Sequence, residues 1–119
     1  MNLDDKIRAI ENHPIDGVTF RDITTLLKDP EAFQEAIDQM LATIDDLEVD
    51  KVVGIEARGF IIGAPIALAL KKGFVPVRKP GKLPHDKLQE SYDLEYGKDS
   101  VEIHRDGIDP GEKVFVVDD

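Results

Sequence analysis

The sequence predicts an α/β fold in which a parallel sheet is flanked by helices, and three observations predict it. Two short apolar runs, residues 51–55 and 114–117, lack the alternation of a half-exposed strand, which is typical of strands buried on both faces of a parallel sheet. Residues 60–70 form an apolar run of helical length with no polar face, which indicates a buried helix. A strand, a short loop and a helix in this order form the frame of a ligand-binding unit.

Length, charge and composition restrict the class of protein. A chain of 119 residues predicts a single domain, residues 1–119. Its net charge of −10 argues against nucleic-acid binding but leaves room for a local basic pocket. The absence of cysteine excludes a disulfide framework and a thiolate metal site. No signal peptide and no apolar run long enough to cross a bilayer are visible, so we expect a cytoplasmic protein without membrane partners.

The N-terminal third of the chain predicts helices. Apolar residues at helical spacing in residues 3–12 predict a short amphipathic helix that ends at the following His-Pro pair. Residues 20–27 predict a connector with one helical turn. Asp29 can cap a helix and Pro30 suits its first position, so a long helix starts here, and we expect it to end near Leu47.

A basic cluster follows the next predicted strand. Residues 73–77 form this strand, and Pro76, which lacks a ladder donor, places it at a sheet edge or strand end. Immediately after it come Arg78, Lys79 and Lys82, held in a loop stiffened by two prolines and a glycine. Because ligands bind at the carboxyl ends of such strands, the cluster predicts a site for a polyanion such as pyrophosphate. The alternative is a solvated loop.

Two further segments lie at carboxyl ends of predicted strands, and each has two interpretations. In residues 56–59, Arg58 stands beside Gly59 near a helix N-terminus, where backbone N–H groups favour an anion. The alternative is a connector in which Gly59 serves tight packing. Asp118 and Asp119 follow the last strand, where they form either part of a ligand site or an acidic terminus.

Residues 85–109 form a long polar excursion between the core strands. Its pattern predicts two strands around a turn at Gly97, and an excursion of this length is usually functional. Glu95 and Tyr96 stand at its tip. His104 alternates with apolar residues, which favours a strand-face position over a catalytic role.

Five motifs in order along the whole chain closely resemble those of the adenine phosphoribosyltransferase family. They are Phe20–Thr24, Gly54–Phe60, Val77–Pro84, Ser91–Gly97 and Val116–Asp119. The Leu-Glu-Tyr-Gly run in the fourth motif favours the adenine branch. The resemblance implies the type I phosphoribosyltransferase fold, a Rossmann-like parallel sheet flanked by helices. It further implies a small N-terminal hood at residues 1–28 and a core at residues 29–119, with a flexible, β-hairpin-like loop at about residues 85–109.

The resemblance also implies an activity. Members of this family join adenine to phosphoribosyl pyrophosphate, giving AMP and pyrophosphate in purine salvage, with Mg²⁺ and as homodimers. The cations that the resemblance places near the pyrophosphate are Arg58, Arg78, Lys79 and Lys82.

The remaining site residues are also assigned through the resemblance. It implies that Asp118 and Asp119 hold the ribose hydroxyls and help to place Mg²⁺, which is bound mainly through the substrate. Glu95 would act as general acid/base at N7 of adenine, and Phe20 and Arg21 would contact the base from the hood.

The sequence departs from the family pattern after Asp119. In the family, the aspartate pair continues into a loop that wraps the phosphate of the substrate, and then into a helix. We therefore expect the natural chain to be longer than these 119 residues, and the chain as given to bind substrate weakly with negligible turnover. Two alternatives remain: a non-catalytic, nucleotide-sensing module of the same fold, and another purine phosphoribosyltransferase.

Overall fold

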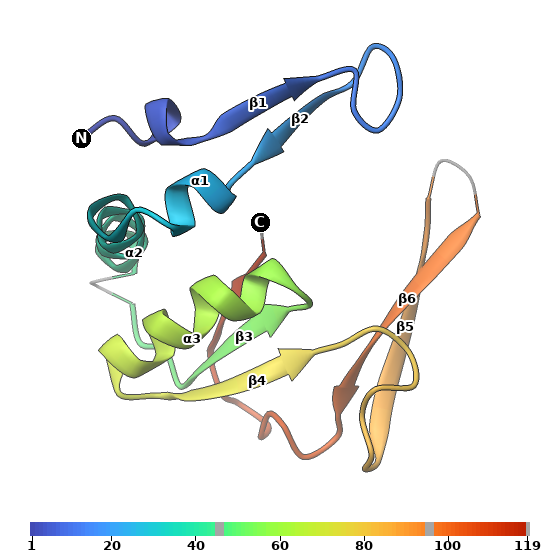
Figure 1. The fold of residues 1–119 in the computed structure, drawn as a ribbon. Helices are drawn as coiled ribbons and strands as arrows, with labels where there is room; N and C mark the ends of the chain where they lie inside the picture. The colour runs from blue at the N-terminus through green and yellow to red at the C-terminus, as the bar shows by residue number, and fades with distance from the viewer. Residues whose placement is uncertain (45–46, 95–96, 119) are drawn as a thin grey trace. The chain divides into compact units, whose positions relative to one another are not determined.

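The computed structural model describes residues 1–44, 47–94 and 97–118. The chain divides into two compact units, Met1–Asp45 and Asp46–Asp119, each of which is described here by itself. Among the helices of the described residues, none has the length and hydrophobicity that a bilayer crossing requires. Figure 1 shows the order of the elements along the chain.

The first unit contains a two-stranded antiparallel ribbon and a helical part. Its elements are the 3-10 helix η1 (Leu3–Lys6), strands β1 (Arg8–Glu11) and β2 (Thr19–Asp22), and helices α1 (Thr24–Leu27) and α2 (Pro30–Thr43). The predicted helix over residues 3–12 is therefore wrong, because β2 pairs with β1 and places Ile10 opposite Phe20. This pairing with a distant segment overrides the local helical spacing.

Helix α2 begins as predicted and ends early. Asp29 Oδ1 accepts hydrogen bonds from the backbone N–H groups of Glu31 (3.1 Å) and Ala32 (3.3 Å), and Pro30 is the first helical residue. The helix ends at Thr43, so the predicted end near Leu47 is wrong. Two aspartates come soon afterwards in the sequence, and negative charge is unfavourable at the negative end of the helix dipole.

The second unit is built on a three-stranded parallel sheet. Strand β3 (Lys51–Ile55) lies between β4 (Gly73–Val77) and β7 (Val114–Val117), and both pairings are parallel. The predicted parallel sheet is therefore confirmed, as is the edge position of the strand that contains Pro76. Helix α3 (Arg58–Leu70) connects β3 to β4 and starts two residues before the predicted helix.

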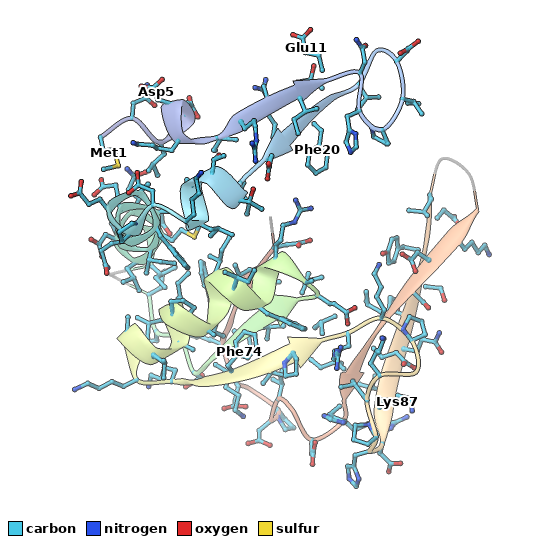
Figure 2. All side chains as sticks on the ribbon, viewed as in Figure 1. Met1, Asp5, Glu11, Phe20, Phe74 and Lys87 are labelled. Carbon is cyan, nitrogen blue, oxygen red and sulfur yellow. The ribbon has the colours of Figure 1, made fainter. Side chains whose placement is uncertain are left out.

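The core of this unit lies between the sheet and α3. Val52 of β3, on the same face as Gly54, and Ile66 of α3 are buried. Phe74 of β4 lies beneath α3 (Figure 2), edge-on to Phe60 with ring centroids 5.9 Å apart. This close contact of helix and sheet positions the loops at the carboxyl ends of the strands.

Strand β7 differs from the prediction in its burial. Val117 is 4% exposed, whereas Val116 is 55% exposed and Val114 is 37% exposed. The expectation that this run is buried on both faces is therefore wrong, because alternate side chains point to opposite faces and only one face is covered.

The predicted hairpin is confirmed. Strands β5 (Lys87–Asp93) and β6 (Lys98–His104) pair antiparallel along their whole length. His104 lies on β6, as the strand-face prediction requires. The hairpin joins the loop after β4 through an isolated bridge between Arg78 and Glu102.

Candidate functional site

The carboxyl edge of the parallel sheet brings three sequence-predicted segments together. Ile55 of β3 pairs with Val77 of β4, and Gly54 pairs with Val117 of β7, so the three strands end at nearly the same level. The loops that follow carry Arg58, the basic loop Arg78–Lys82, and Asp118. Loops at this edge form the ligand site of open α/β sheets.

A close backbone contact positions the first turn of α3 against the end of β7. A Cβ atom added to Gly59 would lie 2.6 Å from the carbonyl oxygen of Val117, which is closer than packed atoms approach. Glycine is therefore required here for tight packing, as one of the two interpretations of this loop holds. The contact brings half-buried Arg58 and exposed Asp118, each one residue away, to the same part of the edge.

Glu56 connects the loop after β3 to the basic loop. Its Oε1 accepts from Arg78 Nε (3.0 Å) and from the backbone N–H of Lys79 (3.2 Å). The hydrogen bond from Arg78, followed by that from Lys79, lowers the pKa of Glu56 and keeps it ionised. The Arg78 guanidinium also lies 6.0 Å from the centre of the Phe60 ring. The sequence interpretation did not assign Glu56, although it stands inside the second family motif directly after a strand.

Lys79 faces the hairpin. Its Nζ donates to Asp99 Oδ2 (2.6 Å) and to the Tyr92 hydroxyl (3.3 Å). The hydrogen bond to Asp99, and then that to Tyr92, raises the pKa of Lys79, and the same bond from Lys79 lowers the pKa of Asp99. Lys82 is exposed and makes no hydrogen bond or ion pair with a described residue. Sequence reasoning missed Asp99, because only the hairpin register shows which lysine it meets.

Glu102 of β6 holds the backbone of the basic loop in its conformation. It is 5% exposed, and its Oε1 accepts from the backbone N–H of Gly81 at 2.8 Å. Gly81 has φ +83°, a conformation that favours glycine. Two backbone hydrogen bonds between Arg78 and Glu102, of 2.9 and 2.8 Å, complete the attachment. The cations therefore stand on a loop whose backbone is held in place.

Four predicted site residues do not belong to the described part of the second unit. Glu95 and Asp119 lie outside the described residues. Phe20 and Arg21 belong to the first unit, where Phe20 is half-buried and Arg21 is exposed on β2. Within residues 1–44, 47–94 and 97–118, no group of three or more carboxylate or imidazole side chains could hold a metal ion.

The fold and this edge define the class of protein. The protein is an α/β protein with a parallel sheet, and cations on a fixed loop beside a helix N-terminus, at the carboxyl edge of that sheet, are the arrangement by which such proteins can bind an anionic ligand. Such a site can hold a phosphate ester or a pyrophosphate and stabilise negative charge that develops on it.

Comparisons with known proteins identify the family. Adenine phosphoribosyltransferases from Alkaliphilus metalliredigens and Clostridium perfringens are each 57% identical to this chain over all of its 119 residues, which span 70% and 69% of their lengths. The crystal structure of the Thermoanaerobacter pseudethanolicus adenine phosphoribosyltransferase matches with a TM-score of 0.94 at 46% identity, covering 99% of this chain and 70% of that one. No family model matches. The chain belongs to the adenine phosphoribosyltransferase family, whose members are glycosyltransferases, and the fold that the motifs implied is confirmed.

Proposed function

We propose that this protein joins adenine to phosphoribosyl pyrophosphate, giving AMP and pyrophosphate in purine salvage. The observation that carries the proposal is 57% identity over the whole chain to adenine phosphoribosyltransferases. A further relative supports the choice of base: the adenine phosphoribosyltransferase of Saccharomyces cerevisiae, 39% identical with a TM-score of 0.91, was crystallised with adenine.

In this proposal the cations at the carboxyl edge act on the pyrophosphate. Negative charge builds on the leaving group as its bond to C1 of the ribose breaks. Arg58, Arg78, Lys79 and Lys82 stabilise that charge, and donors that are already in position need little rearrangement to do so. The attachment of the basic loop through Glu102 supports this role, because it restricts where Arg78 and Lys79 can lie.

Carboxylates and Mg²⁺ complete the sugar and phosphate site in the same proposal. Asp118 and Asp119 bind the 2- and 3-hydroxyl groups of the ribose. Mg²⁺ prefers oxygen ligands and keeps several waters, so exposed Asp118, directly after β7, fits a water-mediated contact to the ion. The bound ion neutralises part of the charge on the pyrophosphate.

We assign the base to the hood and the hairpin tip. Phe20 and Arg21 contact adenine, and Glu95 exchanges a proton with N7, which makes N9 a better nucleophile. The hairpin at residues 87–104 closes over the site and excludes water from the reactive sugar cation. Its position directly beside the basic loop supports this role.

We further propose a homodimer in the cytoplasm. Ile61 and Leu68 of α3 are 43% and 79% exposed and lie two turns apart on the same side of the helix. Exposed apolar residues of this kind support an interface between two copies. Light scattering after size-exclusion chromatography measures the mass, and cell fractionation measures the location. A monomer at micromolar concentration contradicts the first part.

The proposed activity is tested by AMP formation. Full-length protein is assayed with phosphoribosyl pyrophosphate and Mg²⁺ and with adenine, guanine, hypoxanthine or xanthine. We expect turnover with adenine and little with the other bases. Turnover with guanine alone would identify another purine phosphoribosyltransferase. Nucleotide binding without turnover of any base would identify a nucleotide-sensing module.

A further inference from the structure

Glu56 contacts three consecutive residues at the end of β4. Its backbone N–H donates to the carbonyl oxygen of Val77 at 2.9 Å. Its Oε1 atom accepts hydrogen bonds from Arg78 Nε at 3.0 Å and from the backbone N–H of Lys79 at 3.2 Å. A carboxylate that served only to balance the charge of Arg78 would not need the two backbone contacts. Glu56 therefore fixes both the end of the strand and the side chain that follows it.

The contact with Glu56 uses one particular donor of Arg78. A guanidinium carries five N–H donors in a rigid plane, one on Nε and two on each Nη atom. Glu56 takes the donor on Nε, and neither Nη atom donates to another residue in the described part of the chain. The Nη pair is the end of the guanidinium fork that can bind two oxygens of one phosphate group side by side. The pairing with Glu56 leaves that end open.

Two further contacts restrict how the Arg78 side chain can turn. The backbone of Arg78 is bonded to Glu102 of β6 in both directions, at 2.9 and 2.8 Å. The guanidinium lies 6.0 Å from the centre of the Phe60 ring of α3. The side chains of Arg78 and Glu56 are 34% and 20% exposed, so solvent screens their attraction only in part. The open end of the guanidinium fork therefore has a defined direction.

We propose that Glu56 is a positioning residue of the pyrophosphate site, which holds Arg78 through Nε so that the two Nη atoms bind one phosphate group of the anion. The fork is then in place before the anion arrives, so little conformational freedom is lost on binding. The part of Arg78 in pyrophosphate binding rests on the proposed function, whereas the role of Glu56 is an addition to it.

Charge and position have separate effects, and two substitutions distinguish them. The carboxylate of Glu56 repels an anion, so the loss of its charge by itself favours pyrophosphate. Glu56→Gln removes the charge and keeps an oxygen that can accept from Arg78 Nε and from the backbone of Lys79. Glu56→Met removes the same charge at a similar length and accepts only weakly. The difference between these two variants therefore measures the hydrogen bonds that hold Arg78, with the charge held constant.

The first test is the affinity for inorganic pyrophosphate with Mg²⁺, measured by isothermal titration calorimetry on the full-length protein. We expect Glu56→Met to bind pyrophosphate about tenfold more weakly than Glu56→Gln, which corresponds to roughly one hydrogen bond to a charged group. Equal affinities of the two variants would overturn the proposal. Absence of pyrophosphate binding by the wild type would overturn it as well.

Glu112 provides a matched control. Its Oε1 atom accepts from Lys51 Nζ and, at 2.6 Å, from the backbone N–H of Asp109, so it holds a cation and a backbone group as Glu56 does. Lys51 is the first residue of β3, so this contact lies at the amino edge of the sheet. Glu112→Gln and Glu112→Met should therefore differ in the free energy of unfolding but not in pyrophosphate affinity. An equal difference in affinity at both positions would trace the effect to general stability and contradict the proposal.

The second test asks whether Glu56 acts through the fork of Arg78. Lysine keeps the charge but has a single ammonium group, which cannot replace a guanidinium that uses Nε and Nη for different partners. In the Glu56→Gln protein we expect Arg78→Lys to weaken pyrophosphate binding by about tenfold. In the Glu56→Met protein, where the fork is no longer oriented, the same substitution should cost less than about threefold. Equal losses in the two backgrounds would refute the proposed role.

AMP formation by the same proteins is measured separately. Pyrophosphate binding that differs between Glu56→Gln and Glu56→Met, without AMP formation by the wild type, would contradict the proposed function and support this inference. AMP formation by the wild type, with equal pyrophosphate affinities of the two variants, would support the proposed function and contradict this inference. The failure of one is thereby distinguished from the failure of the other.

Discussion

Arg78 and Lys79 are adjacent in the sequence and yet meet two different carboxylates. Arg78 pairs with Glu56 of the loop after β3, and Lys79 pairs with Asp99 of the hairpin. Each pairing lowers the pKa of its carboxylate, so both remain ionised at neutral pH. In the proposed reaction, the affinity of these cations for pyrophosphate is therefore the difference between their contacts with the anion and their contacts with these carboxylates. Glu56 and Asp99 determine that difference as directly as the cations do.

The proton transfer proposed for Glu95 is tested by Glu95→Gln, which retains the shape and removes the titratable group. We expect kcat for AMP formation to fall by about 10²–10⁴, the usual contribution of general acid/base catalysis. Steady-state kinetics with adenine measures the effect. The control is Glu90→Gln, an exposed position on β5 of the same hairpin, which should leave kcat unchanged. A fall of less than about threefold in Glu95→Gln would remove Glu95 from this role.

At the scale of elements, the site depends on how closely α3 approaches β7. Gly59, in the first turn of α3, lies against the carbonyl oxygen of Val117 at the end of β7. The helix start that carries Arg58 and the strand end that carries Asp118 are thereby held side by side. Neither backbone can rotate away from the contact, because each belongs to a regular element.

Gly59→Ala tests this contact. Helix propensity alone would favour alanine by about 1 kcal/mol, but the added Cβ would meet a backbone oxygen. We expect a net loss of about 1–3 kcal/mol in the free energy of unfolding, as for other overpacked sites, together with weaker pyrophosphate binding. Urea unfolding followed by circular dichroism measures the first quantity, and calorimetry measures the second.

Gly73→Ala is the matched control for this substitution. A Cβ atom on Gly73, at the start of β4, would meet nothing within 4 Å. This variant should unfold at the wild-type urea concentration or slightly above it, because alanine restricts the unfolded chain. Equal stability of Gly59→Ala and Gly73→Ala would show that the edge can relax without cost.

At the scale of the whole molecule, both units contain carboxylates with lowered pKa values. In the first unit these are Asp22, held by Thr24 and Arg8, and Asp29, held by Lys6 and the start of α2. In the second unit, the carboxylates that face Arg78, Lys79 and Lys51 are lowered in the same way. The pKa of Asp22 falls from 3.8 to about 2. Acid should therefore destabilise both units.

The sign of this pH dependence follows from proton binding. A group whose pKa is lower in the folded state binds more protons when unfolded, so stability falls as the pH decreases through the interval between the two values. For Asp22 this interval is about pH 4 to pH 2. We expect the wild type to lose stability there in urea unfolding. Asp22→Asn should lose less, so the two curves should converge toward pH 2. A constant difference between them from pH 5 to pH 2 would contradict the assignment.

Local signals in the sequence account for much of the fold. Asp29 and Pro30 predict the start of α2 because a cap and a first-turn proline act within one turn. Residues 51–55 and 114–117 predict parallel strands because strands of a parallel sheet are typically continuous apolar runs. For residues 3–12 the predicted helix was wrong. Apolar spacing in so short a segment fits a helix as well as a strand, and here the strand pairs with β2.

The amino-acid sequence was sufficient to predict the family, the parallel sheet and the position of the basic loop after β4. Motifs and periodicity are properties of residues that are close together in the sequence, so they can be recognised without the structure. Contacts across the fold had to come from the structure. Glu56 and Arg78 are 22 residues apart, and Lys79 and Asp99 are 20 apart. Which carboxylate meets which cation depends on strand order and hairpin register, and a shift of one residue would turn Asp99 to the other face. The open face of β7 was decided in the same way, since burial depends on the elements packed around a strand.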